Sequence, residues 1–163
     1  MSARRIASLL VVAVCGWVAL AAQAQVPQYG PNVTYDQARK ALAGAIADAR
    51  RQSLPMAVAV VDTAGQLVAF ERMDNTQTAS TAVAQDKAVS AAMYRRPTKV
   101  FQDGLAAGGA GLRLLTLRGA VAVEGGLPLT VDGKIIGAIG VSGGSAEQDG
   151  VVAKAGADAM AAK

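Results

Sequence analysis

Two glycine pairs in the last third of the chain constrain its fold more than any other feature. Gly125-Gly126 and Gly143-Gly144 bracket two apolar runs, at residues 127–131 and 134–141. The Asp132-Gly133 dipeptide between these runs is a strong signal for a two-residue β-hairpin turn. The pattern predicts an antiparallel strand pair with a glycine loop at each open end, where backbone amides can approach a ligand without a Cβ in the way.

Capping boxes mark the starts of the first and the last predicted helix. Thr34 is followed by Gln37, and Ser145 is followed by Gln148 at the same spacing. Apolar residues recur at helical spacing after both capping boxes, and the first such run ends at about Arg51. The sequence therefore predicts one helix at each end of the domain.

The segments between these helices predict further strands and helical turns. Residues 56–61 and 66–73 are apolar runs separated by turn-forming residues, which indicates a hairpin. Residues 80–95 are rich in alanine and contain no Gly or Pro, so they predict a helix, and 98–106 predict one or two further turns. Residues 117–123 predict a fifth strand. The element order indicates an α+β domain with a five-stranded antiparallel sheet flanked by helices.

The N-terminal residues have the pattern of a secretory signal peptide. Arg4-Arg5 precede the apolar run 6–21, and Ala22-Gln23-Ala24 provides a small-residue cleavage site. A membrane-spanning helix is the alternative, but the run is short for spanning and no stop-transfer residues follow it. We expect cleavage near Ala24, a flexible lead-in over 25–33, a single domain over 34–163 and a periplasmic or secreted protein without a stable membrane anchor.

The charge balance indicates a partner other than nucleic acid. The whole chain has 16 Lys+Arg and 12 Asp+Glu, and removing Arg4 and Arg5 leaves 14 basic against 12 acidic residues. The charges are scattered and form no basic stripe, so the sequence predicts no nucleic-acid binding. The single cysteine, Cys15, lies within the predicted leader, so we expect no disulfide in the mature domain.

The residue types that are missing exclude several kinds of site. The chain contains no histidine, and its one cysteine is expected to be removed with the leader. Zinc-finger sites, thiolate haem ligation, Cys–His catalysis and Ser–His–Asp triads all need one of these side chains. The sequence therefore predicts no metal site and identifies no catalytic residue.

Several sequence blocks carry a resemblance to a known family. They are residues 57–65, 70–74, 86–88, 95–98, 124–128 and 133–149. The run 136–144, followed by Glu147-Gln148-Asp149, is the most specific of them. On these blocks the chain resembles the GlcG/HbpS-like family of haem-binding proteins, which also includes the C-terminal domain of PduO-type proteins.

The resemblance has consequences for fold, assembly and ligand. It implies profilin-like α/β/α layers with five antiparallel strands, and a homo-oligomer, commonly an octamer in better-known relatives. Some exported relatives bind haem and have been associated with haem degradation or redox sensing, whereas other members have no settled activity. Haem is therefore the expected cofactor, and the family fixes the fold better than the chemistry.

The candidate ligand-binding residues combine the glycine loops with nearby charged and aromatic side chains. They are Arg72, Lys87, Tyr94, Gly125, Gly126, Ser142, Gly143, Gly144, Ser145 and Glu147. Amides at the two glycine pairs could bind the carboxylate of a planar ligand if they are open and face a shared hollow, with help from the helix dipole. The Tyr94 phenolate could ligate haem iron, although packing is the commoner role of such a residue. The glycines could also simply permit a tight turn or a bulge.

Three functional hypotheses remain open from the sequence. The leading one is an exported, oligomeric protein that binds haem or a related tetrapyrrole as a small-molecule ligand with carboxylate groups. The second is an enzyme that acts on haem or on a small carboxylate or aromatic substrate without His or Cys catalysis. The third is a structural or partner-binding oligomer.

Overall fold

The computed structural model describes residues 26–162, so the predicted leader and its cleavage site lie outside the described residues. The elements follow in the order α1 (Tyr35–Arg51), β1 (Ala57–Asp62), β2 (Leu67–Arg72), α2 (Ser80–Tyr94), α3 (Lys99–Ala106), the 3₁₀ helix η1 (Gly109–Thr116), β3 (Gly126–Val131), β4 (Lys134–Ser142) and α4 (Ala146–Ala161). None of the helices between residues 26 and 162 has the length and apolar character that a membrane span needs.

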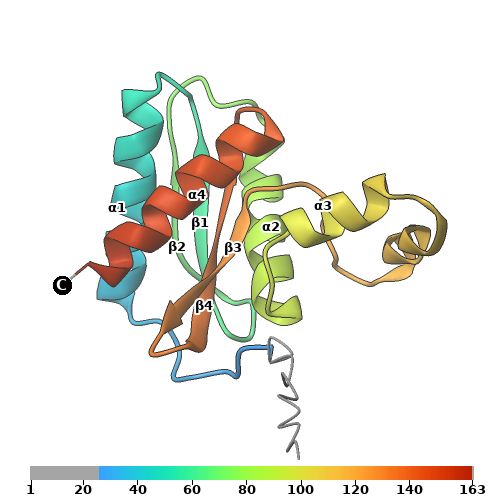
Figure 1. The fold of residues 1–163 in the computed structure, drawn as a ribbon. Helices are drawn as coiled ribbons and strands as arrows, with labels where there is room; N and C mark the ends of the chain where they lie inside the picture. The colour runs from blue at the N-terminus through green and yellow to red at the C-terminus, as the bar shows by residue number, and fades with distance from the viewer. Residues whose placement is uncertain (1–25, 163) are drawn as a thin grey trace, which may run out of the picture.

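The strands form one antiparallel sheet in the order β2-β1-β4-β3 (Figure 1). Helices α1 and α4 pack against one face of the sheet, and α2 packs against the other (Figure 1). The predicted α+β fold with layers of helices around an antiparallel sheet is confirmed, as are both capping boxes and both hairpins. Asp132 and Gly133 have φ of 49° and 73°, as the tight turn between β3 and β4 requires.

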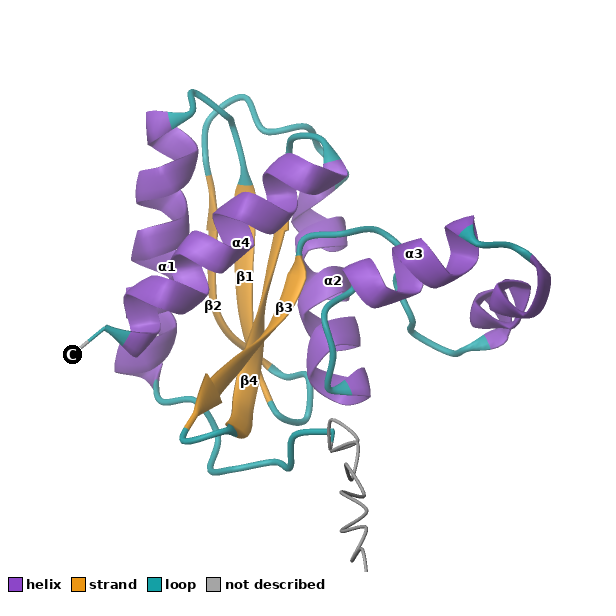
Figure 2. Cartoon of the chain, viewed as in Figure 1, coloured by secondary structure: helices purple, strands orange, loops and turns teal. Residues whose placement is uncertain are grey.

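The prediction of a fifth strand at residues 117–123 is wrong. This segment is an irregular loop after η1 (Figure 2), and the sheet of the described residues has four strands. Gly119 has a φ of 75°, which is incompatible with an extended strand. In addition, β1 pairs with β4 from Gly137 to Ser142, and β3 pairs with its other edge, so these edges of β4 are not left for residues 117–123. An apolar run alone is therefore not sufficient to predict a strand.

The segment before α1 follows the start of β4. The Gly30 amide donates to the Ile135 carbonyl at 2.7 Å, and the Val33 amide donates to the Ile136 carbonyl at 2.6 Å. Tyr29 forms an isolated parallel bridge with Ile135. These contacts fix the entry of the chain into α1 beside the first residues of β4, with which β1 does not pair.

Small residues bring α2 unusually close to the sheet. Ala84 and Ala88 on α2 are fully buried against β1 and β4. A Cβ placed on Gly140 of β4 would lie 2.0 Å from the Ala84 carbonyl oxygen and 2.5 Å from the Ala88 amide. Only a glycine at this position allows the helix backbone to rest on the strand.

Gly140→Ala is therefore expected to lower the free energy of unfolding by about 1–3 kcal/mol, the usual cost of overpacking a core. The clash involves backbone atoms of α2, which cannot rotate away as a flexible side chain could. Urea denaturation followed by circular dichroism measures the change. An unchanged midpoint would show that α2 does not lie this close to β4.

Candidate functional site

Lys87 on α2 and Asp149 in the first turn of α4 form a buried ion pair. The Lys87 Nζ lies 2.6 Å from the Asp149 Oδ2, and the two side chains are only 1% and 4% exposed. The Lys87 Nζ also donates to the Val141 carbonyl at 3.1 Å. Burial raises the pKa of the Asp149 carboxyl, whereas the hydrogen bonds from Lys87 and from the Gly144 amide act in the opposite direction. The pair joins β4 to helices from both faces of the sheet.

The first glycine pair packs directly against this ion pair. A Cβ on Gly125 would lie 2.9 Å from the Lys87 Nζ and 2.7 Å from the Val141 oxygen, and Gly125 has a φ of +123°. A Cβ on Gly126 would lie 2.3 Å from the Lys87 carbonyl oxygen. These glycines are thus required for the close approach of one backbone segment to another.

The expectation that the glycine-loop amides are open is wrong for three of them. Each donates to a side chain of the same protein, so it is not available to a ligand carboxylate. The acceptors are Thr98 Oγ1 for Gly126 at 2.9 Å, Asp149 Oδ1 for Gly144 at 3.0 Å and Gln148 Oε1 for Ser145 at 2.9 Å. The capping box and the buried carboxylate satisfy the donors at this helix start.

The other predicted residues lie apart from one another. Ser142 is buried and donates its hydroxyl hydrogen to a serine of α2. The Tyr94 hydroxyl donates to a backbone carbonyl after η1, and its ring packs edge-on against Phe101 with centroids 5.2 Å apart. Arg72 and Glu147 are exposed, and hydrogen bonds from the Glu147 amide and the capping serine lower the pKa of Glu147. Their contact with a ligand stays a prediction.

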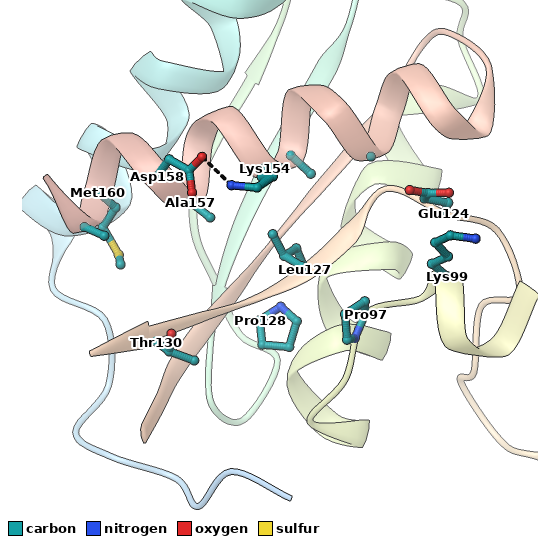
Figure 3. A pocket seen from close by; sticks show the side chains of 13 residues that line it. Pro97, Lys99, Glu124, Leu127, Pro128, Thr130, Lys154, Ala157, Asp158 and Met160 are labelled. Carbon is teal, nitrogen blue, oxygen red and sulfur yellow. Dashed lines mark hydrogen bonds and ion pairs between the residues drawn. The ribbon is translucent and has the colours of Figure 1, made fainter. Parts of the chain in front are cut away.

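A cavity of about 460 Å³ lies between α4, β3 and the segment that joins α2 to α3 (Figure 3). Its apolar walls include Leu127 and Pro128 from β3 and Ala153, Ala157 and Met160 from α4. The volume and the apolar walls are typical of a small-molecule site. None of the ten residues predicted from the sequence lines this cavity.

Charged groups surround the apolar walls of the cavity. Lys154 and Asp158 pair with each other on α4 at 2.6 Å (Figure 3), and Lys99 pairs with Asp103 at 2.7 Å. Both pairs are exposed, so each contributes little to stability and can exchange its partner. The rim can therefore present two ammonium groups to the carboxylates of a bound molecule.

Met160 provides the one soft metal-ligating atom among the residues that line the cavity. Its side chain is nearly buried and lies at the α4 end of the cavity (Figure 3). Within residues 26–162, no cluster of three or more His, Cys, Asp or Glu side chains could hold a metal ion. The Met160 thioether therefore faces an apolar space.

A sequence signal for this cavity existed in α4. Gly150, Ala153, Ala157 and Ala161 recur at helical spacing and all face the cavity. Small side chains along one face of a helix leave room for another group, whether a packed helix or a ligand. The glycine pairs point only to backbone amides, so a site predicted from them does not include the small side chains of α4.

Comparison with known proteins shows which family the chain is related to. Residues 33–158 match the family model described as "Haem degrading protein HbpS-like". The chain is also 34% identical over 129 residues to an uncharacterised 15.0 kDa protein from the dhaT-dhaS intergenic region of Citrobacter freundii. That alignment covers 78% of this chain and 91% of the relative.

Two solved structures share the fold of this chain. The PduOC:heme complex superposes with a TM-score of 0.71 at 28% identity, covering 78% of this chain and 94% of PduOC. A double mutant of Streptomyces reticuli HbpS superposes with a TM-score of 0.73 at 30% identity, covering 85% of this chain and 94% of HbpS. The fold of the chain is therefore shared with these proteins.

Proposed function

Because this chain belongs to the HbpS-like family, we propose that it binds haem or a related tetrapyrrole. The observation that carries the proposal is the apolar cavity between α4 and β3, together with a family match that spans most of its walls. The similarity to PduOC, whose structure is a heme complex, supports the same ligand class. When bound, haem would supply iron chemistry that the chain lacks on its own.

The residues of the cavity fit the chemistry of haem. Leu127, Pro128 and Ala157 provide apolar surface for the porphyrin faces, and Lys99 and Lys154 stand at the rim for its propionates. A methionine thioether is an established haem ligand, so Met160 is the axial donor we propose.

Titration of the mature protein with haemin tests the proposal. We expect a saturable Soret change at micromolar haemin, since an apolar cavity with two cationic groups suits this ligand. Met160→Leu keeps the apolar volume and should alter the Soret and charge-transfer bands without abolishing binding. The absence of a saturable change in the wild-type protein would refute haem binding.

Degradation of the bound haem is a second candidate function, which the description of the family model favours. The titratable side chains that line the cavity are Lys99, Glu124, Lys154 and Asp158. Incubation of the haem-loaded protein with ascorbate and oxygen, followed by chromatography for open-chain tetrapyrroles, distinguishes degradation from binding alone. A variant in one of these side chains that no longer forms open-chain tetrapyrroles but still binds haem with the same affinity would support an enzymatic function.

Export is also part of the proposal. It rests on Arg4-Arg5, the apolar run that follows them and the cleavage pattern ending at Ala24. Expression of the full chain with fractionation should give a periplasmic or secreted protein whose N-terminus is Gln25. A full-length protein retained in the cytoplasm would contradict export.

A homo-oligomer is proposed from the exposed arm formed by α3, η1 and the loop to β3. Residues 102–124 include no buried residue, although they contain five leucines. Leu112 and Leu115 are 53% and 71% exposed, and Figure 1 shows the arm projecting from the layers. Exposed apolar surface of this kind marks interaction sites, and a second copy of the chain is the partner we propose.

Replacing Leu112 and Leu115 with serine together is expected to reduce the particle mass to that of a single chain. The exposed leucines are proposed to be buried between copies, so their loss removes the apolar contact. Light scattering during size-exclusion chromatography measures the mass. Val151→Ser is the matched control, because Val151 is 56% exposed on α4, outside the arm. An unchanged mass in the double variant would exclude the arm as the interface.

A further inference from the structure

We propose that the outer edge of β2 binds an extended acidic segment of a partner protein, which adds a strand to the sheet. The two outer strands of the sheet differ in how their free edges are protected. β3 contains Pro128, which hinders pairing with another strand. β2 contains no proline, and its one register irregularity lies at its start, where Val60 pairs with Ala69 and Val61 pairs with Leu67. The regular edge from Ala69 to Arg72 therefore remains a template for strand addition.

The backbone of β2 directs hydrogen-bonding groups outward. The Met73 amide donates to the Met56 carbonyl at 3.0 Å, which places Met73 in a hydrogen-bonded antiparallel pair. Because such pairs alternate along a strand, Glu71 also faces β1, whereas Phe70 and Arg72 present their amides and carbonyls to the outside. Across residues 26–162, no strand or bridge covers this edge.

A groove of about 540 Å³ runs beside this edge, between β2 and α1. Its floor includes the side chains of Leu42, Ala43 and Ile46 from α1. An exposed edge strand next to a helix-walled groove is the arrangement that binds peptides by strand addition, where alternate side chains of the peptide enter the groove.

The charges around the groove favour an acidic partner. Arg39 and Arg50 line the groove from α1, and Arg72 lines the adjoining hollow at the end of β2. Arg39 stacks over the Tyr35 ring at 6.0 Å. The Arg50 guanidinium lies 3.9 Å from Glu71, and the two side chains are 68% and 43% exposed, so this pair is easily exchanged for a partner carboxylate.

Asp74 is the other acidic residue of the adjoining hollow, and it lies next to Arg72 and Met73. Three guanidinium groups thus face two carboxylates around the groove and hollow. Carboxylates on alternate positions of an extended segment would meet this excess of positive charge. Electrostatic complementarity of this kind sets the specificity and the association rate of a complex.

A fluorescein-labelled octapeptide of alternating glutamate and valine, with blocked termini, is the probe for this edge. Fluorescence anisotropy should show saturable binding to the wild-type protein and none for the lysine–valine peptide. Phe70→Pro removes the outward amide, and Phe70→Ala is its matched control because it loses the same ring and keeps the amide. We expect binding to persist in Phe70→Ala and to disappear in Phe70→Pro.

Charge reversal provides an independent test. Arg39→Glu with Arg50→Glu is expected to weaken peptide binding by about tenfold or more, because like charges then face each other. The affinity of this variant for haemin should equal that of the wild-type protein. A failure of the peptide-binding proposal can therefore be told apart from a failure of haem binding. Equal affinity of the wild-type and Phe70→Pro proteins for the peptide would overturn the proposal. The proposal would also be overturned if Phe70→Pro lowered the particle mass while the wild-type protein did not bind the peptide. The edge of β2 would then pair with a second copy of the chain.

Discussion

Lys87→Met is expected to lower the free energy of unfolding by about 3–5 kcal/mol, the usual cost of breaking a buried ion pair. The variant leaves the Asp149 carboxyl buried without its ammonium partner, and it removes the hydrogen bond from Lys87 to the Val141 carbonyl. Urea denaturation of the purified protein measures the loss. A domain whose free energy of unfolding is about 5 kcal/mol would then be substantially unfolded at room temperature.

The loss in the free energy of unfolding caused by Lys87→Met should grow as the pH rises. Burial already raises the pKa of Asp149, and loss of Lys87 removes an effect that lowers it. A carboxyl whose folded pKa lies above its unfolded pKa takes up its proton more readily in the folded state, so stability falls as the pH rises through that interval. Denaturation in mildly acidic and mildly alkaline buffers checks this sign.

The double variant Lys87→Met with Asp149→Asn is the control for the ion pair. Asparagine keeps an oxygen for the Gly144 amide while it removes the buried charge. We expect the double variant to be more stable than Lys87→Met, since no unpaired charge remains. If both variants were equally unstable, the loss would come from packing of the lysine side chain and not from its charge.

Ala157→Phe is expected to weaken haem binding by about 5–150-fold. The new ring would project from α4 into the cavity, and forcing a ligand against an overpacked wall costs about 1–3 kcal/mol, which corresponds to that range of affinity. Fluorescence quenching or the Soret change during haemin titration measures the dissociation constant.

Ala43→Phe is the matched control for this experiment. Ala43 is also an alanine on a helix that lines a groove, but that groove lies between α1 and β2. The affinity of the Ala43→Phe variant for haemin should equal that of the wild-type protein. A loss of affinity in Ala43→Phe with none in Ala157→Phe would place haem in the α1–β2 groove instead.

Local signals predicted most of the fold correctly. The capping boxes at Thr34 and Ser145 and the turn at Asp132-Gly133 depend on neighbours within a few residues, so the sequence displays them directly. The erroneous strand at 117–123 depended on apolar composition alone. A strand also needs a free partner edge, which is a property of the whole sheet.

The candidate site was harder to predict because the same residues serve packing and binding. Gly125 and Gly126 suggested the approach of a ligand, yet they allow the approach of Lys87 and of neighbouring backbone. Whether an amide is open depends on side chains that are distant in sequence, as Thr98 is for Gly126. Lys87 is buried and already pairs with the Asp149 carboxylate within the chain. Its contact with a ligand carboxylate stays a prediction.

Paramagnetic broadening by ferric haemin tests most directly whether haem binds between α4 and β3. In an NMR spectrum of the isotope-labelled mature protein, substoichiometric haemin should broaden the amide signals of Leu127, Ala153 and Ala157 first. Signals of Ala43 and Ile46, which line the groove beside β2, should remain sharp. Broadening centred on Ala43 and Ile46, or no selective broadening at all, would contradict haem binding in this cavity.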